Sequence, residues 1–135
     1  MATPQFIGAV SRQSGLSIQT IRYYAELGLL KTQGRTAGGY RLFGEDVFVR
    51  LHFIKRAQRL GLTLTDIKEL LDIYDGGKMP CDRVKEKLSQ KVTEIEQQIE
   101  QLHLLKQELQ GLLRGWPAMP TPPQSTICPV LQRLP

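Results

Sequence analysis

Apolar residues recur in the second half of the chain at steps of four and three, the spacing of one face of an α-helix. With Pro80 at its start, the pattern predicts a helix from Cys81 to about Leu113, on the order of 50 Å long at about 1.5 Å per residue. No other predicted helix is long enough to cover this stripe, which favours a coiled coil with a second copy of the chain; a bundle helix in a monomer is the alternative. Broken only at Lys106, the stripe consists of Leu88, Val92, Ile95, Ile99, Leu102, Leu109 and Leu113.

Two short helical patterns near the N-terminus predict a helix-turn-helix. The first covers residues 7–14 and ends at Gly15, and the second covers residues 17–27. Ser17 is suited to the N-cap of the second helix, and Gly28 to its C-terminal end.

The second of these helices has two faces. Ile18, Ile21 and Ala25 are expected to point inward. The opposite face can enter a DNA major groove, where an arginine fork reaches phosphate or guanine. A small helical hairpin with a solvated polar face is the alternative. We expect DNA contacts from this face, namely from Gln19, Thr20, Arg22 and Tyr23.

The segment 31–43 is rich in turn-forming residues and predicts a hairpin, or wing. Gly38 and Gly39 allow a close approach of the backbone to a ligand, and Tyr40 and Arg41 follow where they can clamp a sugar-phosphate chain.

Two further helices precede the long one. The first is expected from about residue 45 to residue 60, where Gly61 stops it. Thr63 with Asp66 resembles a capping box that starts the next helix, which runs to about Tyr74 and is followed by a break at 75–78.

Charge is unevenly distributed along the 135 residues, whose formal net charge is +5. Residues 1–61 hold nine Lys and Arg against three acids, a net +6, and the remainder sums to −1. A basic first half suggests a polyanionic partner. Neither a membrane span nor a secretion signal is found in the sequence, so we expect a cytoplasmic protein. No catalytic arrangement is present, so an enzyme is not expected.

Three stretches resemble the signatures of the MerR family of transcription regulators: IRYYAELGLL at 21–30, GGYRLF at 38–43 and RLGLTLTDIKELL at 59–71. The resemblance implies a mainly α fold, in which a winged helix-turn-helix domain (1–75) precedes an antiparallel coiled-coil dimerisation helix (80–114). A Pro-rich effector loop with a short terminal helix (115–135) completes the predicted architecture. Pro129 suits the first position of that helix, which is expected to follow Cys128 and to run to about Arg133.

The resemblance also implies a function. A homodimer would bind a palindromic operator in double-stranded promoter DNA and, on sensing its effector, distort that DNA so that RNA polymerase can initiate. By the same resemblance, five residues fall where family members touch DNA. They are Arg22, Tyr24, Tyr40, Arg41 and Arg56.

The family's metal-responsive branch uses a cysteine at the start of the dimer helix and others in the loop of the partner subunit. Cys81 and Cys128 match two of these positions, but Trp116 stands where the remaining loop cysteine is expected. Two thiolates suit a linear soft ion such as Cu(I) or Hg(II), with Met119 as a possible thioether donor, and do not suffice for four-coordinate zinc. Oxidation of the same thiols to an intersubunit disulfide is an alternative, as is an architectural DNA-bending protein with no effector.

Overall fold

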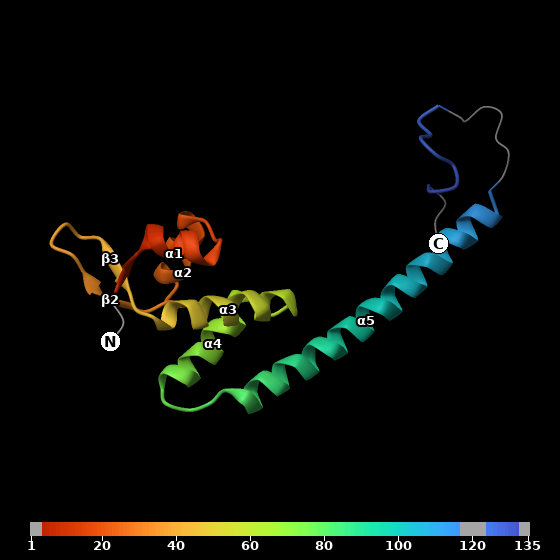
Figure 1. The fold of residues 1–135 in the computed structure, drawn as a ribbon. Coiled ribbons are helices and arrows are strands. Elements are labelled where there is room, and N and C mark those ends of the chain that lie inside the picture. Colours follow the sequence, from red (N-terminus) through yellow and green to blue (C-terminus); the bar gives the residue numbers. More distant parts are fainter. Residues whose placement is uncertain (1–3, 117–123, 133–135) are drawn as a thin grey trace. The chain divides into compact units, whose positions relative to one another are not determined.

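The computed structural model describes residues 4–116 and 124–132. The fold is mainly α, as predicted, and the chain divides into two compact units, residues 1–91 and residues 92–135. Helix α5 passes from the first unit into the second (Figure 1). Among the described residues, no helix combines the length and apolar character needed to cross a membrane.

The order of the elements is that of a winged helix-turn-helix followed by a long helix, and the wing and the helices predicted before residue 115 are confirmed to within a few residues. The elements are β1 (Gln5–Phe6), α1 (Ile7–Ser14), α2 (Ile18–Glu26), β2 (Thr32–Arg35), β3 (Arg41–Phe43), α3 (Asp46–Arg59), α4 (Leu64–Asp75) and α5 (Cys81–Arg114).

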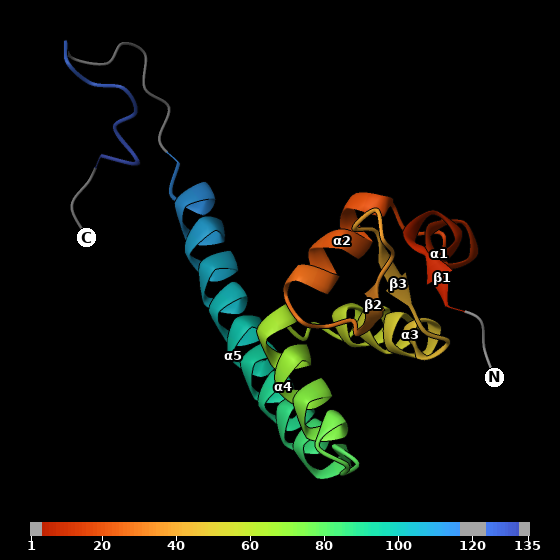
Figure 2. The same ribbon diagram turned by 90° about the vertical axis from the view of Figure 1, so that its left-hand side faces the viewer.

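The wing is a small antiparallel sheet with strand order β1-β3-β2. Phe43 is the shared partner, since it pairs with Gln5 of β1 and with Thr32 of β2. Strand β1 was not predicted, because two residues are too short for an alternating pattern. Figures 1 and 2 show α1 and α4 on opposite sides of α3.

Helix ends follow the predicted capping. The Ser17 hydroxyl accepts a hydrogen bond from the Thr20 amide at 3.1 Å, and both halves of the Thr63–Asp66 capping box are formed, each at 3.1 Å. Gly28 has a φ of +80°, a left-handed conformation that side chains disfavour, so it can end α2 without strain.

The core of the first unit is a single apolar cluster built from α1 to α4 and β3. Its fully buried side chains include Val10, Ile21, Phe43, Ile54 and Ile67. The inward orientation expected for Ile18 is wrong: 41% of this residue is exposed. It is the first residue of α2, and the core contacts of this helix begin one turn later, at Ile21.

One charged residue of α3 lies inside this unit. Only 3% of Arg50 is exposed; its Nε donates to the Leu29 carbonyl at 2.8 Å, and its Nη1 and Nη2 donate to the two carboxylate oxygens of Asp75 at 2.7 and 3.2 Å. Hydrogen bonding to Arg50, with the nearby charge of Lys31, lowers the pKa of Asp75 despite partial burial. Arg50 thus joins α3 to the segment after α2 and to the end of α4.

We predict that Asp75→Ala lowers the free energy of unfolding by about 2–4 kcal/mol, because it leaves a buried guanidinium without its carboxylate. Asp72→Ala, which removes an exposed i,i+4 partner of Lys68 on the same helix, should cost less than about 0.5 kcal/mol. Urea denaturation of both variants measures the difference, and equal losses would contradict the role of Arg50.

The Arg50–Asp75 pair should make the free energy of unfolding depend on pH. The folded-state pKa of Asp75 lies below its unfolded value of about 3.9, so its contribution is complete well above that value and is lost as the pH falls through the folded pKa. The stability difference between wild type and Asp75→Asn should therefore shrink below about pH 4. A difference that stays constant down to about pH 2 would show that the carboxylate charge of Asp75 is not involved.

Candidate nucleic-acid interface and sensor cysteines

The outer face of α2 carries most of the residues expected to touch DNA. Gln19, Arg22 and Tyr23 are exposed, and Thr20 is half-buried with its hydroxyl 2.8 Å from that of Ser17. The N-cap that starts α2 therefore also orients Thr20 at the edge of this face.

The two neighbouring tyrosines of α2 differ in their surroundings. Tyr23 is 50% exposed, whereas Tyr24 is 8% exposed and belongs to the core. The Tyr24 hydroxyl donates to Oε1 of Gln58 on α3 at 3.1 Å. The face argument from the sequence selected Tyr23 and the family resemblance selected Tyr24; the structure presents Tyr23 to the solvent and uses Tyr24 in packing.

The wing is closed by its own hydrogen bonds. The Thr36 amide donates to the Tyr40 carbonyl at 2.9 Å, and the Tyr40 amide donates to the Thr36 hydroxyl at 3.2 Å. Gly39 has a φ of +85°, and its carbonyl accepts from Arg35 Nη1 at 3.2 Å. This turn leaves Tyr40 exposed beside a backbone without a Cβ, while Arg41 is half-buried in β3.

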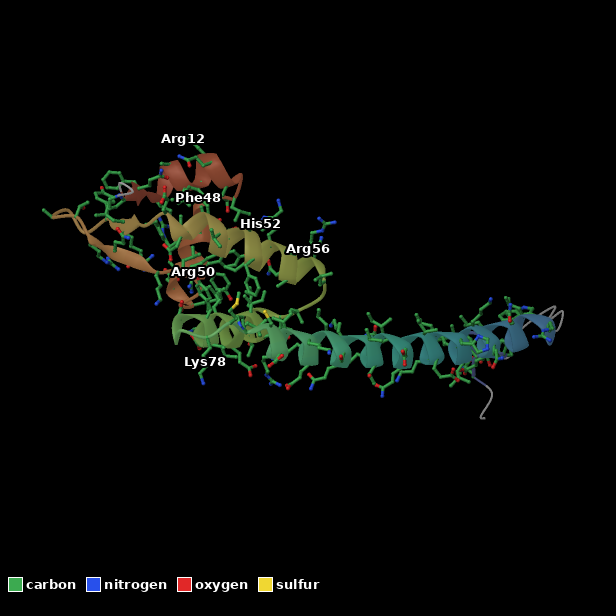
Figure 3. The ribbon with its side chains drawn as sticks, turned by 60° about the horizontal axis from the view of Figure 1, so that its bottom comes forward. Arg12, Phe48, Arg50, His52, Arg56 and Lys78 are labelled. Atoms are coloured by element: carbon green, nitrogen blue, oxygen red, sulfur yellow. The ribbon has the colours of Figure 1, made fainter. Side chains whose placement is uncertain are left out.

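A basic stripe runs along α3 at i, i+3, i+4 and i+7. It consists of His52, Lys55, Arg56 and Arg59, all exposed, which line a shallow hollow of about 340 Å³. Figure 3 shows His52 and Arg56 on the side of α3 away from α4, whereas Arg50 points toward α4. The family resemblance placed Arg56 in the DNA site. Lys55 and Arg59 were not among the expected DNA-binding residues, although their spacing places them on the same face.

Cys81 is the first residue of α5 and is an exposed free thiol. It lies at an apolar cavity of about 370 Å³ between α3, α4 and the first turns of α5. Aliphatic and aromatic side chains dominate the lining, among them Phe53, Leu70, Leu71, Tyr74 and Val84.

Beside this cavity, an ion-pair cluster joins α4 to α5. Lys87 is 7% exposed, and its Nζ lies 2.6 Å from Glu69 Oε2 and 3.1 Å from Asp66 Oδ1. Arg83 binds Glu69 at 2.8 Å and Glu86 at 2.6 Å. Hydrogen bonding to Glu69 raises the pKa of Lys87, and hydrogen bonding to Lys87 lowers that of Glu69. The first turns of α5, including Cys81, are thus fixed to α4 by charges that the sequence pattern did not reveal.

Cys128 lies in the second unit, in a single turn. The terminal helix expected after it is absent from residues 124–132: one i→i+4 bond is formed, from the Gln132 amide to the Cys128 carbonyl at 3.1 Å. Gln132 Oε1 accepts from the Ile127 and Cys128 amides, so within residues 124–132 these amides are satisfied inside a single turn. Trp116 is 51% exposed. Met119 lies outside the described residues.

The number of thiols restricts which metal ions this chain could bind. Within residues 4–116 and 124–132, no group of three or more His, Cys, Asp or Glu residues is arranged to hold a metal. Two accessible thiols suit a two-coordinate soft ion and do not suit a four-coordinate zinc site.

The helix-turn-helix, the wing and the basic stripe, followed by a long helix, define a DNA-binding regulator of transcription. Comparison with known families identifies it further: residues 6–73 match the MerR HTH family regulatory proteins, and residues 48–112 match the family's "MerR, DNA binding" region. The chain belongs to the MerR family and is not an enzyme.

Individual relatives agree with this assignment. The mercuric resistance operon regulatory protein of Bacillus cereus is 37% identical over 111 residues, covering 82% of this chain and 84% of the relative. A probable heavy metal-dependent transcriptional regulator of Haemophilus influenzae is 39% identical over 104 residues, covering 77% and 81%. The crystal structure of PbrR691 from Ralstonia metallidurans CH34 in complex with lead(II) superposes with a TM-score of 0.74 at 30% identity, covering 85% of this chain and 90% of that one.

Because Tyr24 is buried and Tyr23 is exposed, their replacement by alanine should affect stability and DNA binding differently. Tyr24→Ala should lower the free energy of unfolding by about 3–4 kcal/mol, because it empties part of the core. Tyr23→Ala should change stability by less than about 1 kcal/mol and weaken binding to DNA selected by the wild-type protein. Thermal unfolding and fluorescence anisotropy measure the two effects.

Proposed function

We propose that this chain is an effector-responsive transcription regulator that acts as a homodimer on a palindromic promoter operator and distorts the DNA when a soft metal ion is bound. The observation that carries the proposal is the position of Cys81: an exposed thiol on the first turn of the long helix, which ion pairs attach directly to the DNA-binding unit. RNA polymerase is the proposed protein partner and the cytoplasm the proposed location.

The DNA surface proposed here combines α2, the wing and α3. Gln19, Thr20, Arg22 and Tyr23 would enter the major groove from α2, and Gly39, Tyr40 and Arg41 would follow the sugar-phosphate chain. Arg56, with the rest of the α3 stripe, would neutralise phosphates. Tyr24 would support this surface from the core through its bond to Gln58.

Dimerisation is proposed through α5. Val92, Ile95, Ile99, Leu102, Leu109 and Leu113 are each at least 46% exposed in the single chain. An apolar stripe at coiled-coil spacing that its own chain leaves exposed is suited to a second copy of the same helix. The proposed arrangement is antiparallel, as the family resemblance implies.

The proposed effector site uses both thiols, with Cys81 from one subunit and Cys128 from the partner. A soft ion such as Cu(I) or Hg(II) matches two sulfur ligands. Because both cysteines are free, oxidation to an intersubunit disulfide is the second candidate, and it would need no metal.

DNA binding should weaken steeply with added salt, because phosphate contacts release counterions. Arg22→Ala should lower affinity for wild-type-selected DNA by about tenfold or more, and Arg41→Ala should also reduce the salt dependence. Lys78→Ala removes the same charge from an exposed position on the side of the unit opposite the α3 stripe (Figure 3) and should have little effect. Equal losses at Arg22 and Lys78 would show that net charge, rather than a docking face, causes binding.

Mixed dimers test the effector site. Cys81→Ser or Cys128→Ser alone should abolish ion-dependent transcription in vitro while ion-free DNA affinity stays near wild type. A dimer of one Cys81→Ser chain and one Cys128→Ser chain retains one intact site if the ligands come from different subunits, and none if a single subunit supplies both.

A mixed dimer that does not respond, beside an active wild type, would therefore refute the shared site. The redox alternative makes a different prediction. It requires an intersubunit crosslink on mild oxidation, visible on a non-reducing gel, and no dependence on the ion under strict reduction.

A further inference from the structure

Three hydrogen bonds connect Gln132 to the backbone around Cys128. Its side-chain Oε1 accepts from the Ile127 amide at 2.8 Å and from the Cys128 amide at 2.9 Å, while its own amide donates to the Cys128 carbonyl at 3.1 Å. Both polar groups of the Cys128 backbone are therefore bound by one residue.

The turn needs this outside acceptor because of its sequence. A turn that starts with Ser, Thr, Asp or Asn binds the free amides that follow with its own side-chain oxygen. A thiol is a weak acceptor, and the next residue, Pro129, has no N–H. Gln132 supplies the missing oxygen from the other end of the turn.

This arrangement has a consequence for the sulfur. Since Gln132 holds the backbone, Sγ of Cys128 takes no part in closing the turn and is left available to a ligand. Val130 of the same turn is only 6% exposed, so burial of this side chain accompanies the hydrogen bonds of Gln132, although Cys128 lies in no helix or strand.

We propose that Gln132 is a positioning residue for Cys128: it fixes the backbone so that the thiol is presented to the effector without further ordering. The inference rests on the proposed function, in which Cys128 is an effector ligand. A pre-ordered ligand loses less conformational entropy when it binds, so the contribution appears as ion affinity.

Gln132→Leu keeps the approximate size of the side chain and removes its acceptor, and Gln132→Glu restores an acceptor. Gln124→Leu and Gln124→Glu are the matched controls, since Gln124 is an exposed residue described in the same unit. The first readout, in ion-free reduced full-length protein, is amide hydrogen exchange at Ile127 and Cys128 by NMR. The second is the affinity for Hg(II) alone, from competition with dithiothreitol followed by thiolate-to-mercury absorption.

We expect Gln132→Leu to speed exchange at both amides and to weaken Hg(II) binding by about tenfold, which corresponds to about 1.4 kcal/mol. Gln132→Glu should stay close to wild type in both readouts, and so should both Gln124 variants. Ion-free DNA affinity should not change in any of them.

Unchanged amide exchange in Gln132→Leu would overturn the inference, because the hydrogen bonds would not order the turn. Faster exchange with unchanged Hg(II) affinity would overturn it as well, since the order would then serve only the structure. Cys128→Ser separates this failure from that of the proposed function. If that variant binds Hg(II) like wild type, Cys128 is not a ligand and both statements fall; if it binds weakly while Gln132→Leu is normal, only the positioning role is lost.

Discussion

The arrangement of the DNA-binding unit depends on the hydrogen bonds of the buried Arg50 guanidinium. A charge that is 3% exposed must be paired, and its partners come from the Leu29 carbonyl after α2 and from Asp75 at the end of α4. Satisfying one side chain of α3 therefore places the helix-turn-helix relative to α4. The exposed basic stripe lies on the other side of α3, so one helix supplies both an internal anchor and an external cationic surface (Figure 3).

A second charged cluster extends this organisation to α5. Asp66 closes the capping box that starts α4 and also binds Lys87 of α5, while Glu69 binds both Lys87 and Arg83. On the same turns of α5, Cys81 lies at an apolar cavity of about 370 Å³. The first turns of α5 are therefore attached to α4 by ion pairs and also border an apolar hollow. In the proposed function, this junction would couple Cys81 to the geometry of the DNA.

The sequence predicted most of what depends on local pattern and missed contacts whose partner is distant in sequence. Helix positions, the wing and the capping box follow from apolar spacing and from Ser17, Gly28 and Thr63, and all are confirmed. The burial of Tyr24 depends on α3, and Lys87 resembles a surface lysine until Asp66 and Glu69 are seen beside it. The terminal helix was expected from Pro129, but the backbone amides are satisfied by Gln132 within one turn. The DNA and effector residues and the domain boundaries stay predictions.

The number of thiols restricts which ions the proposed site could bind more than the positions of the two cysteines do. Two thiolates complete the coordination of a linear soft ion, whereas tetrahedral zinc requires two more donors, and no cluster of such donors is found in the described residues. A site with so few ligands gains little from multiple coordination, so its affinity depends strongly on how well each thiol is held before binding. Cys81 is held by a helix that ion pairs fix to α4, and Cys128 by a turn closed through Gln132. Both proposed ligands are therefore held by neighbouring residues that are not themselves proposed as ligands.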